Sequence, residues 1–106
     1  MIYRESGQYK TEEGAKLLIP PLDKAIAGLI QDLIDRGLID DTLVVAMGEF
    51  GRTPKINKDA GRDHWAPVNG ALLAGGGMRV GQVIGSTDSA AAYPKDQPIH
   101  FHDVLA

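Results

Sequence analysis

The segment PLDKAIAGLIQDLIDRGLIDDTLVVAM, residues 21–47, contains two patterns that together predict an α/β fold. Apolar residues recur at the period of a helix, and the members of this stripe are Leu22, Ile26, Leu29, Ile30 and Leu33. The stripe predicts a helix over residues 21–36 that Gly37 ends, because glycine tolerates a positive φ. The run over residues 42–47 is continuously apolar and partly β-branched, which predicts a strand covered on both faces, as in a parallel sheet. We expect the stripe to be the buried face of the helix, packed against this strand.

The segments around this unit predict a single partial domain over residues 1–106. Residues 1–16 are poorly patterned, although Thr11 could begin a short helix that Pro20 and Pro21 separate from the main one. Three further elements are expected downstream: an apolar strand within 68–74, a short edge strand or hairpin arm over 79–84, and the start of a helix at 100–106.

The composition argues against several classes of protein. The chain has 106 residues, a formal net charge of -3 and no cysteine, so disulfides and thiolate metal sites are excluded. Lys and Arg form no long run, which argues against nucleic acid as a main partner. No apolar run reaches the ~20 residues that span a bilayer. The first ten residues show no apolar segment typical of a signal peptide, and the localisation stays open.

A polar loop with the sequence GEFGRTPKINKDAGRDHW, residues 48–65, follows the apolar strand. Glu49 lies just past the strand, and the loop returns through Asp63 and His64 to the next apolar run. Ligands of open parallel sheets bind beyond the carboxyl ends of the strands, so these three side chains are expected to converge there. Carboxylate and imidazole groups are suitable ligands for a divalent metal such as zinc or manganese. Glu49, Asp63 and His64 are therefore the candidate metal ligands.

The same loop carries groups suited to an anion. Arg52 and Arg62 have fork geometry that matches phosphate or sulfate oxygens, and the Thr53 hydroxyl lies beside Arg52 in the sequence. Metal ligands beside such arginines suggest hydrolysis or transfer of a small anionic ester. The alternative is that the loop is a salt-bridged structural scaffold. Asp63 and His64 would point in opposite directions along an extended segment, and so would share one metal only if the backbone turned.

Three other features have more ordinary interpretations. Trp65 is expected to be a packing anchor and not a platform for substrate. The glycine-rich segment GGGMRVG, residues 75–81, lacks the Gly-Lys-Ser/Thr ending of a phosphate-binding loop. His100 and His102 are expected to be solvated surface residues.

The segments TLVVAMGEFGRTPKIN (42–57), GRDHW (61–65) and LLAGGGMRVGQVIGSTD (72–88) resemble the C-terminal part of the DUF1501 family of uncharacterised bacterial proteins. That family is placed in the alkaline phosphatase and sulfatase superfamily, and the resemblance covers about residues 17–105. It implies a partial alkaline-phosphatase-like parallel sheet with flanking helices. It also implies a hydrolase of phosphate or sulfate esters.

The resemblance assigns roles residue by residue. Glu49 occupies the place of a metal-binding acid that ends a core strand, and Phe50 stands where a histidine often follows. His64 corresponds to a later histidine that binds a second metal. Asp63 has no clear counterpart and either binds metal or orients His64.

The resemblance also marks what this chain does not match. The nucleophile of the superfamily and its early acid-histidine motif have no counterpart in MIYRESGQYKTEEGAKL, residues 1–17. The chain is therefore expected to be a C-terminal fragment that supplies metal ligands and an anion clamp. The competing hypothesis is a non-catalytic domain that self-associates through an exposed sheet edge.

We expect the 106-residue chain by itself to show no measurable hydrolysis of aryl phosphate or aryl sulfate with added zinc or manganese. The physical reason is that hydrolysis in this superfamily needs a nucleophile held beside the metals. A double variant, Glu49→Ala with His64→Ala, serves as the control. Turnover by the wild-type chain that the double variant lacks would contradict this expectation. Thr53, the hydroxyl closest to Glu49 in the sequence, would then be the first candidate for a nucleophile.

Overall fold

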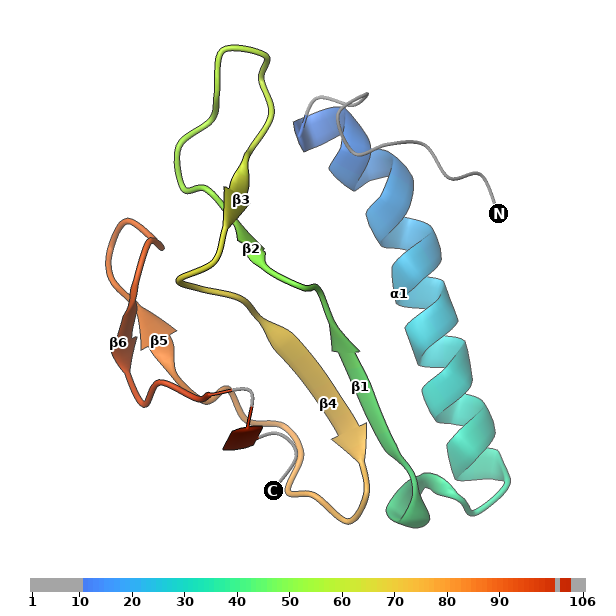
Figure 1. Ribbon diagram of the computed structural model, residues 1–106. Helices are drawn as coiled ribbons and strands as arrows, with labels where there is room; N and C mark the ends of the chain where they lie inside the picture. Colours follow the sequence, from blue (N-terminus) through green and yellow to red (C-terminus); the bar gives the residue numbers. More distant parts are fainter. Residues whose placement is uncertain (1–10, 101, 104–106) are drawn as a thin grey trace.

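The computed structural model describes residues 11–100, 102 and 103, and combines one long helix with small antiparallel sheets (Figure 1). In chain order the elements are α1 (Thr11–Asp35), the 3-10 helix η1 (Ile39–Asp41), β1 (Leu43–Met47), β2 (Gly51–Arg52), β3 (His64–Trp65), β4 (Ala71–Gly75), β5 (Ser86–Thr87) and β6 (Pro94–Asp96). The mixture of helix and strand agrees with the predicted α/β composition. The first ten residues and most of the helix predicted at 100–106 lie outside the described residues.

Helix α1 begins earlier than the sequence pattern predicts. A break was expected at Pro20 and Pro21, whereas α1 starts at Thr11 and continues through both prolines. Each proline lacks the N–H that would donate to the carbonyl four residues earlier. Residues 16–25 are exposed, so water can reach the carbonyls that lose this donor. The two prolines therefore weaken this part of the helix without ending it.

The C-terminal end of α1 lies where the sequence predicts it. Gly37 has a φ of 69°. Its N–H donates to the Ile34 carbonyl over 3.0 Å, and the Leu38 N–H donates to the Leu33 carbonyl over 2.8 Å. These two bonds form a Schellman motif, whose positive φ glycine adopts without steric cost.

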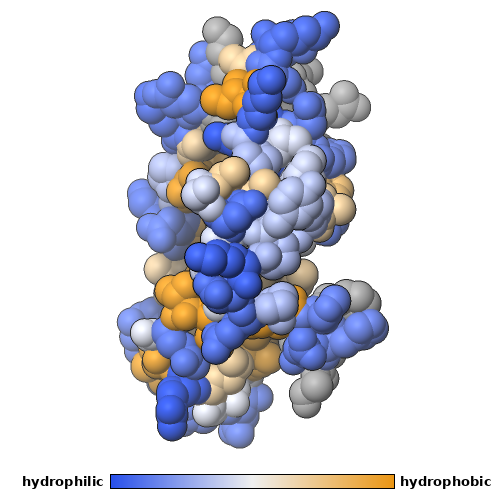
Figure 2. All heavy atoms as spheres, turned by 90° about the vertical axis from the view of Figure 1, so that its left-hand side faces the viewer, coloured by the Kyte–Doolittle hydropathy of each residue, from blue (hydrophilic) through white to orange (hydrophobic). Residues whose placement is uncertain are grey.

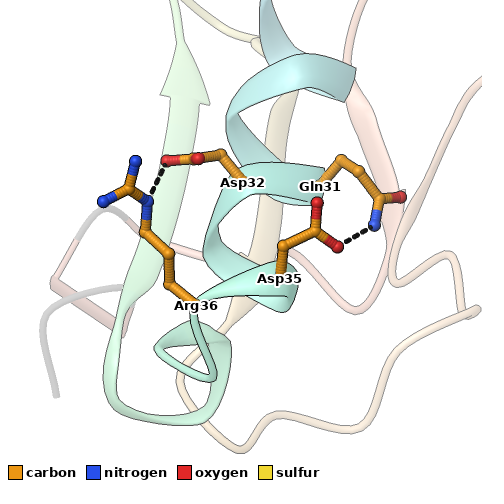
Figure 3. A network of polar contacts seen from close by, with 4 residues as sticks. All are labelled: Gln31, Asp32, Asp35 and Arg36. Carbon is orange, nitrogen blue, oxygen red and sulfur yellow. Dashed lines mark hydrogen bonds and ion pairs between the residues drawn. The ribbon is translucent and has the colours of Figure 1, made fainter.

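Two side-chain pairs span the last turns of α1 (Figure 3). Arg36 donates to Asp32 over 2.8 Å, and Gln31 donates to Asp35 over 2.8 Å. Each pair joins residues four apart, which are neighbours on a helix surface. Both pairs are exposed, so each adds only about 0.2–0.5 kcal/mol to helix stability.

The strands β1 and β4 pair antiparallel, from Leu43 opposite Gly75 to Met47 opposite Ala71. Both strands lie close to their predicted positions. All three strand pairs within the described residues are antiparallel, so the predicted parallel sheet is not found there. The segment 79–84 forms no strand, contrary to prediction, because no neighbouring strand offers it a ladder of hydrogen bonds.

Burial is slight throughout the described residues. No large apolar side chain there is fully buried, and Gly75 is the one residue with very low exposure. On α1, Ile26 and Leu33 are half-buried as predicted, together with Ile30. The prediction was wrong for the other stripe residues that it placed inside: Leu22 is 58% exposed and Leu29 is 48% exposed.

The overall shape explains this lack of a core. The molecule measures 48 × 35 × 20 Å and has a radius of gyration of 16.0 Å, against about 13 Å for a compact chain of this length. Its surface of 8854 Å² exceeds the about 5,700 Å² expected for a folded monomer of this mass. Apolar side chains accordingly reach the surface beside hydrophilic ones (Figure 2). Within the described residues, no helix has the length and apolar character to cross a membrane.

Gly75 and Gly77 allow a matched test of the β1–β4 pairing, because both have a positive φ, of 83° and 67°. A Cβ at Gly75 would overlap the carbonyl oxygen of Thr42 and lie 2.6 Å from that of Ile39, whereas a Cβ at Gly77 meets nothing within 4 Å. Gly77→Ala should therefore cost only the backbone strain, about 1–2 kcal/mol. Gly75→Ala should cost about 2–5 kcal/mol, since overpacking adds to that strain.

Urea unfolding and amide exchange of the β1–β4 hydrogen bonds measure this difference. Equal losses for Gly75→Ala and Gly77→Ala would show that the contacts around Gly75 do not hold the two strands together.

Candidate functional site

The polar loop is a β-hairpin that starts beyond the carboxyl end of β1 (Figure 1). Strands β2 and β3 pair antiparallel, with Gly51 opposite Trp65 and Arg52 opposite His64. The Asn69 side chain donates to the Gly48 carbonyl and so ties the two ends of the loop together. The loop therefore leaves and re-enters the β1–β4 sheet at one end, as the sequence predicts.

Gly51 is required at its position because the backbone of the returning segment approaches it closely. A Cβ at Gly51 would overlap the carbonyl of Val68 and lie 3.1 Å from the carbonyl oxygen of Trp65. The absent side chain lets the backbone of β2 approach the segment between β3 and β4. Glycine at this position thus fixes where β2 and β3 stand relative to the sheet.

Arg62 holds the hairpin loop from inside. Its Nη1 donates to the carbonyls of Thr53 and Pro54, and the bond to Thr53 is 2.6 Å long. Arg62 is half-buried, and these bonds use the guanidinium on backbone oxygens of its own loop. Of the two arginines predicted to bind an anion, Arg62 is therefore the one whose guanidinium stabilises the loop.

Thr53 and Asp63 face each other across the same hairpin. The Thr53 N–H donates to the Asp63 carbonyl over 2.9 Å, and the Asp63 N–H donates to Thr53 Oγ1 over 3.0 Å. Thr53 Oγ1 also donates to the Lys55 carbonyl over 2.9 Å. The Thr53 hydroxyl therefore acts as donor and acceptor within the loop, which does not favour a role as nucleophile.

Asn57 organises the tip of the hairpin, a role that the sequence analysis did not assign. Its Oδ1 accepts from the N–H groups of Asp59 and Gly61 over 3.0 and 2.9 Å. Its Nδ2 donates to Asp63 Oδ1 over 2.9 Å, which fixes the Asp63 carboxylate on the tip. The signal in the sequence was Asn followed by Asp and Gly, a pattern that favours turns bridged by the asparagine side chain.

The other face of the hairpin is open and carries the remaining predicted groups. Arg52 and His64 are directly opposite each other and so project from the same face. The rings of Phe50 and His64 have centroids 3.9 Å apart, and the Arg52 guanidinium carbon lies 5.6 Å from the centroid of Phe50. Arg52 and His64 are both exposed. We call Phe50, Arg52 and His64 the open triad.

The contacts of Phe50 were also missed by the sequence analysis, which noted only that it stands where a histidine often follows. It lies against both the His64 ring and the Arg52 guanidinium, and so limits the movement of each. The alternation Phe50-Gly51-Arg52 in an extended segment was the available signal, because residues two apart share a face.

The geometry does not gather the predicted metal ligands into one group. No cluster of three or more His, Asp or Glu side chains able to hold a metal occurs within the described residues. Asp63 is bonded to Asn57, whereas His64 lies on Phe50. Glu49 is exposed and has no hydrogen-bond or ion-pair partner within the described part of the chain. A structural zinc site needs four ligands and a catalytic one three, so these residues alone do not complete either.

Trp65 is a packing anchor, as predicted. Its Nε1 donates to the Ala92 carbonyl over 2.7 Å, and its ring meets that of Tyr93 edge-on with centroids 5.7 Å apart. These contacts join the hairpin to the segment that carries β5 and β6.

A comparison with protein families identifies the group to which the chain is related. The family model described as "Protein of unknown function (DUF1501)" matches residues 9–106. The chain belongs to the DUF1501 family. No curated protein and no solved structure matches this DUF1501 chain. The family resemblance noted in GEFGRTP and GRDHW is thereby confirmed, and the matched region contains the whole hairpin.

Asn57→Ala should loosen the hairpin tip of this DUF1501 protein, because it removes three hydrogen bonds at once. We expect a loss of about 1–3 kcal/mol in the local stability of the tip. Amide exchange at Asp59 and Gly61 measures it. Lys58→Ala is the matched control, since Lys58 is exposed in the same turn. Equal exchange rates in the two variants would contradict an organising role for Asn57.

Proposed function

We propose that the open triad binds the phosphate or sulfate group of a small ester, and that this DUF1501 chain contributes it to metal-dependent hydrolysis. One observation carries the proposal: Arg52 and His64 are cross-strand neighbours on an exposed face. Two nitrogen-bearing side chains that project together can donate hydrogen bonds to the oxygens of one anion.

Arg52 supplies the principal binding group in this proposal. Its guanidinium donates to the Arg62 carbonyl over 3.3 Å, and its other N–H groups have no partner within the described residues. The planar fork of arginine matches two oxygens of a phosphate or sulfate at once. Because Phe50 supports both Arg52 and His64, less side-chain entropy is lost when an anion binds.

The proposal includes a divalent metal, for which this chain supplies only part of the ligand set. Glu49 and His64 have the donor chemistry of zinc or manganese ligands and are exposed, whereas Asp63 is held by Asn57 and supports the loop. A bound metal would polarise an ester oxygen. Since the described residues do not complete a ligand set, no reaction step is assigned to them. An alkaline-phosphatase-like parallel sheet around the hairpin is part of the same proposal.

The competing interpretation is that the whole hairpin is a structural scaffold. The hydrogen bonds of Arg62, Thr53 and Asp63 within the loop favour it for the inner side of the hairpin. They do not account for the exposed Glu49, or for the N–H groups of Arg52 beyond the one that donates to the Arg62 carbonyl. The two interpretations differ in one measurable property, which is specific anion binding on the open face.

NMR titration of the 106-residue chain with inorganic phosphate and sulfate tests the proposal. We expect the amide and ring signals of Phe50, Arg52 and His64 to shift together and to saturate. Arg52→Gln should weaken binding about 5–10-fold, because it removes a charge-assisted bidentate contact at an exposed site. Lys58→Gln, which removes the same charge from the hairpin tip, should weaken it less than about twofold because salt screens distant charges.

Two results would contradict the proposal. Equal weakening by Arg52→Gln and Lys58→Gln would mean that only net charge attracts the anion. Signals that shift without saturating would favour the scaffold interpretation.

A further inference from the structure

The side chain that joins the two ends of the hairpin belongs to an Asn-Gly pair, Asn69-Gly70. Asn69 Nδ2 donates to the Gly48 carbonyl, and Asn69 Oδ1 accepts from the Gly70 N–H over 2.9 Å. The chain has two asparagines, Asn57 and Asn69, and of these only Asn69 precedes a glycine. The side-chain amide of Asn69 is therefore in contact with the backbone nitrogen that follows it.

This contact places a nucleophile beside an amide carbon. The Gly70 nitrogen lies 2.9 Å from Asn69 Oδ1, which is bonded to Cγ. The torsion about the Cβ–Cγ bond of asparagine has a broad energy profile, so a rotation there can turn Cγ toward that nitrogen. The rotation breaks one exposed hydrogen bond, the bond to the Gly48 carbonyl.

The surroundings of the pair leave this approach open. Asn69 and Gly70 are both exposed, so hydroxide and water reach them. Glycine has no side chain to hinder attack by its own nitrogen. Even a Cβ built at Gly70 would meet nothing within 4 Å, so no other part of the described chain shields the nitrogen.

We propose that Asn69 is a site of spontaneous deamidation in the folded protein, and that the reaction releases the two ends of the hairpin. Hydroxide removes the proton from the Gly70 nitrogen, which then forms a bond to Asn69 Cγ. The Cγ–Nδ2 bond breaks, and Nδ2 takes a proton from water and leaves as ammonia. One water opens the resulting succinimide to aspartate or isoaspartate. The net change consumes one water and releases one ammonia, with no oxidation or reduction.

The product cannot tie the loop as asparagine does. A carboxylate only accepts hydrogen bonds, so an oxygen in the place of Nδ2 would face the Gly48 carbonyl oxygen and be repelled. The isoaspartate form also adds a carbon to the main chain directly before β4, which begins at Ala71. Since Ala71 pairs with Met47, the change acts on one end of the β1–β4 pair. It does not depend on anion binding, because no residue of the open triad takes part.

Peptide mapping by mass spectrometry, after incubation of the 106-residue chain in mildly alkaline buffer, tests the reaction. We expect the mass increase of an amide that becomes a carboxyl group at Asn69. Asn57 is the internal control and should stay intact, because it is half-buried and its amide makes three hydrogen bonds. Gly70→Ala should slow the conversion about tenfold, since the added Cβ hinders attack. Space for this Cβ is free, so the variant should fold as the wild-type does.

Asn69→Asp reproduces one product and tests the structural consequence. Amide exchange at the Met47–Ala71 end of the β1–β4 pair should accelerate about fivefold, the equivalent of one lost hydrogen bond. Gln82→Glu is the matched control. Gln82 is exposed and donates to the Arg79 carbonyl, so the variant makes the same chemical change away from the hairpin. It should leave this exchange within about twofold of the wild-type.

Three outcomes would overturn the proposal. An Asn69 that stays intact in the folded chain but converts in urea would show that the fold protects it. Equal conversion of the wild-type and Gly70→Ala would mean that the Gly70 nitrogen is not the nucleophile. Equal exchange in Asn69→Asp and Gln82→Glu would show that the Asn69 side chain does not hold the ends of the hairpin together.

Discussion

The antiparallel pairing of β1 with β4 is the constraint on which the rest of the structure depends. Gly75 closes this pair, and the carbonyls of Ile39 and Thr42 occupy the space that a side chain would need. At the other end Met47 stands opposite Ala71, so the residues between them must leave and return at one end of the sheet. The polar hairpin lies at that end of the sheet because it connects Met47 to Ala71.

The hairpin divides its polar residues between two tasks. Arg62, Thr53 and Asp63 bond to backbone groups and to Asn57, and thereby give the loop a fixed shape. Arg52 and His64 stand on the open face with Phe50 beneath them. A loop of this length needs internal bonds to stay ordered, since its conformational entropy otherwise favours an open chain. The inner residues therefore hold the hairpin in the shape that places the outer ones on its open face.

The lack of a core follows from the apolar character of β1. The run over 42–47 is apolar at every position after Thr42. Removing either side of β1 from water therefore lowers the free energy of the protein. The described residues leave Leu43, Val45 and Met47 exposed on one of those sides. A small domain that buries so little is only marginally stable, and contact with another apolar surface would add the missing burial.

The sequence by itself determined the features that depend on residues close together in the chain. The helical stripe and the Schellman motif at Gly37 depend on contacts within a few residues, as does the apolar strand that becomes β1. It also placed the polar loop and its candidate residues. Only the tertiary structure decided that the strands pair antiparallel and that Leu29 is exposed. It also decided that Arg62 is half-buried with two bonds to loop carbonyls, whereas Arg52 is exposed with one. These outcomes depend on contacts between segments that are far apart in the sequence. Such contacts decide which side chains are buried, in which direction two strands pair, and which groups form hydrogen bonds.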